Sequence, residues 1–509
     1  MKKTIISLAG LVMGMMAAVA TPLDWGDQGN GTYRNPVLNA DYSDPDVIRV
    51  GDRYYMVASD FHFMGMQVLE SSDMVNWHIV GQVYSRLDLP GWDDGNTHYA
   101  GGSWAPALRY HDGKFFVYFC TPDEGLFMTT ATDPAGPWEP LHCVKAVPKW
   151  EDPCPFFDDD GQAYLVRSRH RAGPIIVHRM SADGRTLLDD GVTVYTGPVA
   201  EGPKWLKRDG YYYIFIPEGG VSTGWQTVLR SKSVYGPYEK RVILEKGSTD
   251  INGPHQGALV DTPDGREWWF YHFQNTPGRG RVVHLQPARW RDGWPAVGVD
   301  IDGNGVGEPV AVWTSPQTGA DRCAPSLPAT SDDFSSSAPG LQWQWNHNPV
   351  DSMWSLTENP GHLTLHTLPA ANLREARNTL TQKVMGFESE ATVMLDTRRL
   401  GREASAGLIC TGKAFRAIGI GPEGIYTECD GERTGVSASR PRKVWFRLTM
   451  DFAANASRFS YSTDGKRFVP AGEPFAMENG YWKGVRTGLF AYGAEGTAEF
   501  DNFDYRIIR

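Results

Sequence analysis

The sequence predicts an all-β protein, with a five-bladed β-propeller followed by a β-sandwich. Three observations support this prediction: a repeat of about fifty residues in the first part of the chain, a Ser/Pro/Thr-rich stretch at 314–340, and alternating strand-like segments beyond it. The chain of 509 residues is long enough for more than one domain. We therefore expect a propeller domain over residues 30–320 and a sandwich over residues 331–509.

The repeat is a Gly/Asp turn followed by an aromatic, β-rich run, which is the signal of a β-hairpin. It reads GDRYYMVAS, HDGKFFVYFC, DDGQAYLVRS, RDGYYYIFIP and PDGREWWFYHF, with glycines at positions 51, 113, 161, 210 and 265. Spacings near fifty residues suit one propeller blade each. A β-sandwich with recurrent hairpins is the alternative, and the five-fold period favours the propeller.

Each unit also carries a polar or aromatic residue next to a proline, before its turn. These residues are Asp44, Trp104, Asp152, Glu201 and His255. Because the innermost strand of every blade lines the central channel, they are expected to converge at one end of it. This convergence would explain why Asp41, Asp44 and Asp46 crowd before a strand although their charges repel one another. Of these three, Asp41 and Asp46 are expected to be structural or supporting groups. Glu151 competes with Asp152, which is preferred because it precedes a proline as Asp44 does.

Hydrophobic and polar residues alternate along segments of the C-terminal half, such as HLTLHTL, SEATVMLDT and KVWFRLTMDF, as expected of strands with one exposed face. This pattern predicts a sandwich that resembles a concanavalin-like jelly roll. Such a module either binds carbohydrate by itself, through Trp343, Trp345 or Trp354, or closes one side of a propeller pocket. For the second role we expect a wall near Phe490–Tyr492.

Charge and targeting signals narrow the partners. The net charge of −11 argues against binding to nucleic acid or to anionic lipid. Residues 1–20 combine two lysines, a short apolar run and Ala-Val-Ala, which predicts a signal peptide rather than a membrane span. We therefore expect a periplasmic or secreted protein without membrane insertion. Its six cysteines show no CxxC spacing, and both disulfides and buried thiols remain open.

The gathered groups suit cleavage of a glycosidic bond. That reaction needs one protonated and one ionised carboxyl group, and a third carboxylate can shift a neighbour's pKa. A tryptophan face stacks on a sugar ring. No Ser-His-Asp order or GxSxG elbow stands out in the sequence, and it has no Walker loop and no GxGxxG that opens a βαβ unit, so nothing indicates other chemistry.

The motifs RNPVLNADYSDPDVI, SWAPALRYHDGKFFVYF, WEDPCPFFDDDG and AEGPKWLKRDGYYYI, in this order, resemble glycoside hydrolase family 43. The closest resemblance is to β-xylosidases and α-L-arabinofuranosidases with a C-terminal sandwich. The resemblance implies inversion at the anomeric carbon. It implies that Asp44 is the general base, Glu201 the general acid, and Asp152 the carboxylate that tunes and orients the acid.

The resemblance also implies substrate contacts. Trp104 and Arg281 match sugar-contacting positions, His255 matches a central histidine near a structural calcium or other cation, and Phe63 is a candidate for a pocket wall together with Phe61 and His62. Ala107 departs from the family, which often has a polar residue there.

These features predict an exo-acting hydrolase that releases pentose from xylan, arabinoxylan or arabinan. SDFHFMGM and WAPAL favour an α-L-arabinofuranosidase, with a β-xylosidase as the alternative. A non-catalytic carbohydrate-binding propeller is the alternative of another class, and the Asp44–Glu201 pair argues against it. A sucrose- or fructan-cleaving propeller is disfavoured because Gly202, not cysteine, follows the acid.

Overall fold

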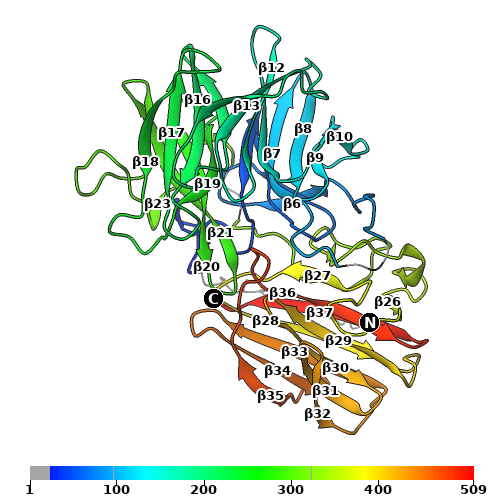
Figure 1. Ribbon diagram of the computed structural model, residues 1–509. Coiled ribbons are helices and arrows are strands. Elements are labelled where there is room, and N and C mark those ends of the chain that lie inside the picture. Colours follow the sequence, from blue (N-terminus) through cyan, green and yellow to red (C-terminus); the bar gives the residue numbers. More distant parts are fainter. Residues whose placement is uncertain (1–22, 94, 96, 322–323) are drawn as a thin grey trace, which may run out of the picture.

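The computed structural model describes residues 23–93, 95, 97–321 and 324–509. The predicted signal peptide lies outside the described residues. Two β domains pack against each other, the propeller in blue to green and the sandwich in yellow to red (Figure 1). The only helix among the described residues is a short 3-10 turn, Asp351–Met353, and none is long and apolar enough to cross a membrane.

The propeller has five four-stranded antiparallel sheets, each formed by four consecutive strands. The first two blades are β3 (Asp46–Val50), β4 (Arg53–Val57), β5 (Gln67–Ser71) and β6 (His78–Gln82), then β7 (Trp104–His111), β8 (Lys114–Thr121), β9 (Gly125–Ala131) and β10 (His142–Ala146). The third and fourth are β11 (Trp150–Phe157), β12 (Ala163–Arg169), β13 (Ile175–Met180) and β14 (Val192–Tyr195), then β15 (Lys204–Arg208), β16 (Tyr211–Glu218), β17 (Trp225–Ser231) and β18 (Glu239–Leu244). The fifth is β19 (His255–Asp261), β20 (Trp268–Thr276), β21 (Gly280–Arg291) and β22 (Trp294–Val297).

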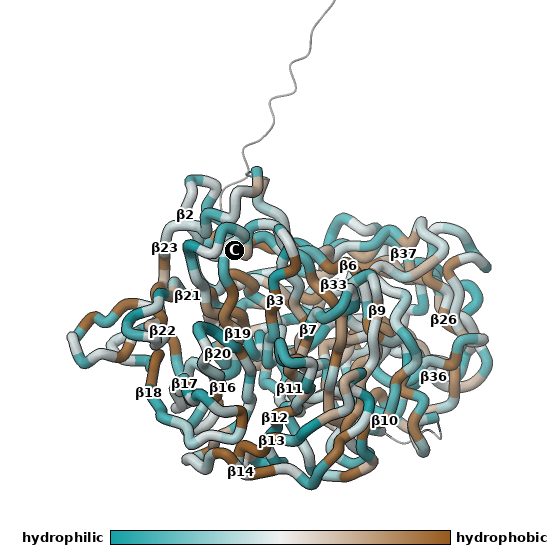
Figure 2. The backbone as a smooth tube through the Cα atoms, turned by 90° about the horizontal axis from the view of Figure 1, so that it is seen from above, coloured by the Kyte–Doolittle hydropathy of each residue, from teal (hydrophilic) through white to brown (hydrophobic). Residues whose placement is uncertain are grey.

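The five repeated glycines are the turns between the first and second strands of the blades. All five have positive φ, from 64° to 80°. At Gly51, Gly113, Gly161 and Gly210 an added Cβ would meet no atom within 4 Å. Conformation rather than space therefore demands glycine at these turns. In Figure 2, β3, β7, β11 and β19 lie toward the middle of the propeller, while β14, β18 and β22 lie toward its rim.

The ring is closed by segments from both ends of the domain. β1 (Gly26–Asp27), β2 (Thr32–Arg34) and β23 (Val312–Thr314) form a small sheet. Leu38 pairs with Val283 of β21, which attaches the start of the propeller to its last blade. The first and fifth blades also touch through β3 and β19.

The C-terminal domain consists of two seven-stranded sheets. One has the order β24 (Gln344–Trp345), β27 (Leu380–Lys383), β36 (Arg486–Gly493), β29 (Ala404–Thr411), β30 (Phe415–Gly421), β31 (Gly424–Cys429) and β32 (Glu432–Ser437). The other has the order β25 (Trp354–Ser355), β26 (Leu363–His366), β37 (Thr497–Ile507), β28 (Glu388–Asp396), β33 (Lys443–Asp451), β34 (Ala456–Ser462) and β35 (Val469–Phe475). In β33 alternate residues are buried, as expected for a strand with one face on the core.

The tryptophans proposed as an exposed binding surface are mostly core residues. Trp343 and Trp345 are buried, and Trp354 is only partly exposed and packs on Trp345. Met64 of the propeller donates its backbone N–H to the carbonyl of Trp345. These rings therefore support the contact between the domains. The described cysteines Cys120, Cys143, Cys154, Cys410 and Cys429 are all free thiols.

The two domains meet backbone to backbone at the β20–β21 turn of blade 5. An added Cβ on Gly280 would lie 2.4 Å from the backbone nitrogen of Gly484. Val485 donates its N–H to the carbonyl of Gly278 at 2.7 Å, and Asn479 donates to the carbonyl of Thr276. This backbone contact fixes the sandwich segment 479–485 against the propeller.

Candidate active site

A cavity of about 230 Å³ opens where the innermost propeller strands begin. It is smaller than the pockets of about 300–1,000 Å³ that hold drug-sized ligands, and its size suits one or two sugar rings. Its walls come from all five blades and from the sandwich: Asp44, Phe61, Trp104, Ala105, Glu151, Asp152, His170, Arg171, Glu201, Val221, His255, Gln256, Arg281 and Trp482.

The backbone has the same unusual conformation at the start of every inner strand. One residue per blade has positive φ: Asp44 (55°), Ala105 (34°), Asp152 (57°), Gly202 (56°) and Gln256 (37°). Such values are uncommon for residues other than glycine and mark functional sites. The structure therefore aligns Glu201, Trp104 and His255 with Glu151, the residue before Asp152. Counting back from the turns misses this offset because the turn of blade 3, between Phe157 and Ala163, is longer than that of blade 2, between His111 and Lys114.

Asp44 is the most firmly held of the carboxylates. Its Oδ1 pairs with Arg281 Nη1 at 2.7 Å. Its Oδ2 accepts hydrogen bonds from Ser59 Oγ at 2.6 Å and Ser43 Oγ at 3.1 Å. One cation and two hydroxyl donors stabilise a negative charge on this buried group. The arrangement suits a base that accepts a proton from water.

Asp152 and Glu201 form a second carboxyl group cluster with Glu151. Oxygens of the three lie within 4.8 Å of one another. Asp152 Oδ2 accepts hydrogen bonds from Ser168 Oγ and from the backbone N–H of Gly202. Burial, and then the nearby Glu201 charge, raise the pKa of Asp152 to about 6, although these donors oppose the shift. All three line the cavity, and Glu201, with 18% of its side chain exposed, is the most accessible of them.

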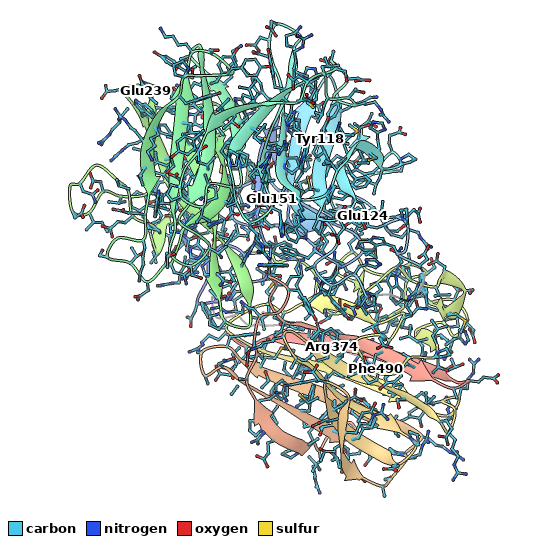
Figure 3. All side chains as sticks on the ribbon, in the orientation of Figure 1. Tyr118, Glu124, Glu151, Glu239, Arg374 and Phe490 are labelled. Carbon is cyan, nitrogen blue, oxygen red and sulfur yellow. The ribbon has the colours of Figure 1, made fainter. Side chains whose placement is uncertain are left out.

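Glu151 is the carboxyl group that sequence reasoning set aside. It is buried, and burial followed by the charge of Asp152 raises the pKa of Glu151 to about 9. Its Oε1 accepts the N–H of Ala172 at 2.9 Å, and its Oε2 lies 3.4 Å from His170 Nδ1. Figure 3 labels it among the propeller strands. Its alignment with Glu201 was the signal that could have identified it.

The flanking acids of the DYSDPD stretch hold neighbouring elements in place. Asp46 is buried and accepts hydrogen bonds from Arg109 Nη1 at 2.7 Å and from the N–H of Leu108. Asp41 Oδ1 accepts the N–H of Arg281, and its Oδ2 lies 3.6 Å from Lys483 of the sandwich. The crowded charges are therefore compensated by cations from other blades and from the second domain.

Of the predicted substrate contacts, Trp104, Arg281 and His255 line the cavity. Trp104 anchors its Nε1–H on the carbonyl of Ala100 and lies edge-on to Phe61. Phe63 does not line the cavity. It is buried beneath Lys483 and Arg486, and its place on the wall is taken by Phe61. The prediction that Phe63 lines the pocket is therefore wrong, because the chain turns here and the two rings point in different directions.

His255 is buried beside Phe273 at the floor of the site. Its Nε2 lies 3.0 Å from Glu201 Oε1 without the alignment of a hydrogen bond, and neither ring nitrogen has a hydrogen-bond partner among the described residues. Calcium takes six to eight oxygen ligands. One imidazole and one carboxylate do not make such a cage, and the only set of metal-type ligands among the described residues is Glu151, Asp152 and Glu201. Most ligands of a calcium ion here would have to be carbonyl oxygens or waters, and the cation expected near His255 stays a prediction.

The sandwich supplies one wall of the cavity through Trp482. Tyr481 and Trp482 form a two-residue turn with φ of 55° and 63°, closed by paired backbone hydrogen bonds between Gly480 and Lys483. Such turns usually contain Asn-Gly. Tyr481 stacks on Tyr99 of the propeller, which leaves Trp482, 53% exposed, over the Phe61 ring.

The predicted wall near Phe490–Tyr492 is wrong. Phe490 and Tyr492 are buried in β36 and pack inside the sandwich, where Figure 3 labels Phe490. The same part of the chain approaches the site only through the turn that precedes β36.

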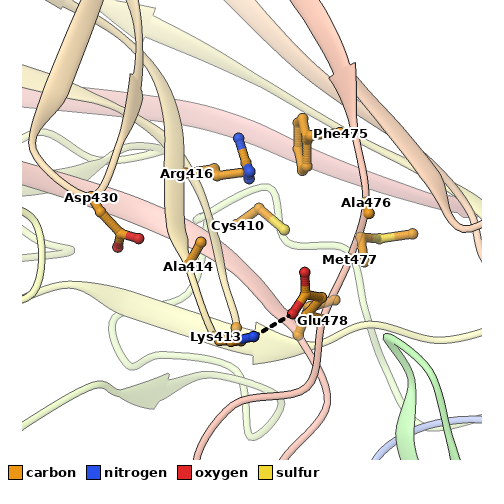
Figure 4. A pocket seen from close by; sticks show the side chains of 11 residues that line it. Cys410, Lys413, Ala414, Arg416, Asp430, Phe475, Ala476, Met477 and Glu478 are labelled. Carbon is orange, nitrogen blue, oxygen red and sulfur yellow. Dashed lines mark hydrogen bonds and ion pairs between the residues drawn. The ribbon is translucent and has the colours of Figure 1, made fainter.

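A separate hollow lies on the sandwich, behind the segment that carries Trp482. Figure 4 shows Cys410, Arg416, Phe475 and Glu478 around it, with Lys413 Nζ paired to Glu478 at 2.9 Å. The Arg416 guanidinium lies 4.9 Å from the centre of the Phe475 ring. Because this cation covers the aromatic face, the hollow offers no free platform for a sugar ring.

The model of the family "Glycosyl hydrolases family 43" matches residues 33–295. The chain belongs to this family. A second model, "Beta xylosidase C-terminal Concanavalin A-like domain", matches residues 331–506. The family 43 assignment agrees with the carboxylate site of the propeller, and the protein is a glycoside hydrolase.

Individual family 43 relatives match along most of the chain. A putative beta-xylosidase of Xylanibacter ruminicola is 61% identical over 464 residues, covering 91% of this chain and 87% of the relative. A beta-xylosidase of Formosa agariphila is 38% identical and covers 94% and 91%. A non-reducing end alpha-L-arabinofuranosidase of Bacteroides ovatus is 35% identical, over 66% and 65%. The crystal structure of a family 43 protein from Bacillus licheniformis superposes with a TM-score of 0.80 at 28% identity, over 93% of this chain and 99% of that one.

Proposed function

We propose that this protein is an exported, exo-acting, inverting β-xylosidase that releases xylose from the ends of xylan fragments. The single observation that carries the proposal is the pocket itself. Asp44 with its arginine, and Glu201 in a carboxyl cluster, come from different blades and line one small cavity that Trp482 walls on one side. A small cavity of this kind suits a chain end better than the middle of a polymer.

The sugar is assigned by similarity. The sequence motifs favoured an α-L-arabinofuranosidase, and that preference is not confirmed. The relatives that match with higher identity and greater coverage have β-xylosidase names, whereas the arabinofuranosidase matches over two thirds of the chain. These names support the β-xylosidase alternative.

In the proposed reaction the carboxyl groups move the protons. Asp44 accepts a proton from the water that attacks the anomeric carbon, while Arg281 and the serine hydroxyls hold its carboxylate in place. Glu201 donates a proton to the leaving oxygen. Ser168 and the Gly202 N–H fix the Asp152 carboxyl group next to Glu201. Repulsion between the two negative charges favours keeping a proton in this pair, and Glu201 passes that proton to the substrate.

The test compares an aryl β-xyloside with an aryl α-L-arabinofuranoside, followed by digestion of xylo-oligosaccharides and arabinoxylan fragments. We expect a higher kcat/KM for the xyloside and a weaker activity on the arabinoside. Proton NMR of the first-formed xylose should show the α-anomer. Release of arabinose alone would restore the arabinofuranosidase interpretation, early β-xylose would refute inversion, and binding without hydrolysis would favour a carbohydrate-binding propeller.

A further inference from the structure

The mouth of the cavity carries a positive charge that the proposed reaction does not use. Arg171 lines the cavity beside His170, and its side chain is exposed and makes no hydrogen bond or ion pair within the part of the chain that the structure describes. Lys149 lies next to the same turn, since its carbonyl accepts the N–H of His170. Arg171 and Lys149 both lower the pKa of His170, after burial, whereas Asp123 opposes them. Such a cationic rim is unusual in a chain with a net charge of −11.

The turn that presents Arg171 is strained and anchored. Arg171 and Ala172 have φ of 69° and 58°, values that residues other than glycine seldom adopt. Glu151 accepts the N–H of Ala172, and Gly173 donates its N–H to the carbonyl of Ala200, next to Glu201. Because Glu151 and the backbone before Glu201 hold this uncommon conformation, the position of Arg171 is set by the active site itself.

Glu151 does not cancel the charge of Arg171. Its carboxyl faces the backbone of the turn, and its raised pKa keeps it protonated at neutral pH. The guanidinium is therefore free to pair with a ligand. A guanidinium binds a carboxylate through two parallel hydrogen bonds, which neutral sugar hydroxyls cannot match.

We propose that Arg171 is a specificity-determining residue that binds a carboxylate on the leaving saccharide, such as a uronic acid branch on the second sugar. This inference rests on the proposed function. With the terminal sugar placed between Asp44, Arg281 and Phe61, which all line the cavity, the rest of the substrate would leave through the mouth. There Trp104 lies between His170, at 5.2 Å, and Trp482, at 5.1 Å between ring centres. A branch on the His170 side meets Arg171, and one on the other side meets the Trp482 ring.

The experiment compares neutral xylotriose with xylotriose that carries glucuronic acid on its second xylose. Arg171→Gln should lower the acidic-to-neutral ratio of kcat/KM by about three- to tenfold, as expected for a partly exposed charged contact. Arg169→Gln is the matched control, because Arg169 is an exposed neighbour that does not line the cavity. Its ratio should stay at the wild-type value. Raising the salt concentration should lower the wild-type ratio and leave that of Arg171→Gln nearly constant.

Calorimetric titration of the two oligosaccharides into Glu201→Gln, with and without Arg171→Gln, measures the same preference without turnover. Loss of the acidic preference with Arg171→Gln supports the inference. An unchanged preference, or an equal loss with Arg169→Gln, overturns it. If no variant and no wild-type enzyme releases xylose from either substrate, the proposed function fails, and the calorimetric comparison still decides whether Arg171 binds the carboxylate.

Discussion

The floor and the wall of the cavity are built in different ways. The floor consists of side chains at equivalent places in five blades, held by the backbone of inner strands that start with positive φ. The wall that the sandwich adds is a single two-residue turn, Tyr481–Trp482, which lies over Phe61. The floor therefore arises from repetition within one domain, whereas the wall depends on the contact between two domains.

This difference separates catalysis from substrate fit. The hydrogen bonds of Asp44 and Asp152, and the 3.0 Å approach of Glu201 to His255, involve no atom of the sandwich. The domains are nevertheless joined by buried charges, because Asp60 of the propeller pairs with Lys383 of the sandwich at 3.1 Å. We expect changes in the floor to abolish the chemistry, changes in the interface to reduce stability, and changes in the wall to reduce specificity constants.

The largest effect is expected in the floor. Glu201→Gln should lower kcat on xylobiose by about 10² to 10⁴, since a general acid is worth that much. A dinitrophenyl xyloside needs little protonation of its leaving group, so its rate of glycosidic cleavage should fall far less. Asp44→Asn should impair both substrates alike, because water activation is required in each case. Equal losses on both substrates with Glu201→Gln would contradict the assignment of the acid.

Much of the floor could be predicted from sequence, because it follows from the repeat. The Gly/Asp turns fixed the five units, and Asp44, Trp104, Asp152, Glu201, His255 and Arg281 all line the cavity. Glu151 was set aside because Asp152, like Asp44, precedes a proline, and because the longer turn between Phe157 and Ala163 hides the equivalence of Glu151 and Glu201 when residues are counted from the turn. Trp482 was missed because no period relates a turn of the sandwich to a blade. The turn that carries Trp482 also has bulky residues at positive φ, where such turns usually have Asn-Gly.

The second effect concerns the interface. Asp60→Asn should destabilise the folded protein by roughly 3–5 kcal/mol, because it leaves Lys383 and Lys483 buried without their shared partner. Burial would raise the pKa of Asp60, but Lys383, Lys483 and Arg486 outweigh it and lower the pKa. Thermal unfolding measures the effect, with the exposed Asp52→Asn as control. A melting temperature equal to that of the control would show that the domains do not depend on this pair.

The third effect sharpens the distinction between wall and floor. Trp482→Ala should lower kcat/KM on xylobiose about tenfold, which corresponds to about 1.4 kcal/mol of lost ring contact. Trp313→Ala, at a tryptophan 39% exposed and outside the cavity, is the matched control. The fold should be kept in both, as judged by melting. An unchanged kcat/KM for Trp482→Ala would mean that the sandwich is not part of the working site.

The smallest effect comes from Glu151 and appears as a pH dependence of stability. Its pKa is raised from the usual 4.5 of the unfolded chain to about 9 in the folded protein. Between these values the unfolded state releases a proton that the folded state keeps, so stability falls as the pH rises through this window. The lowered pKa of Lys483, about 7 because of burial, acts in the opposite direction above pH 7. The loss of stability should therefore be steepest between about pH 4.5 and 7.

The variant Glu151→Gln tests this. It keeps an acceptor for the Ala172 N–H but cannot ionise, so its melting temperature should exceed that of the wild type at pH 7 by about 1–3 °C and match it near pH 4. A parallel pH profile for the two proteins would show that Glu151 is already ionised in the folded state.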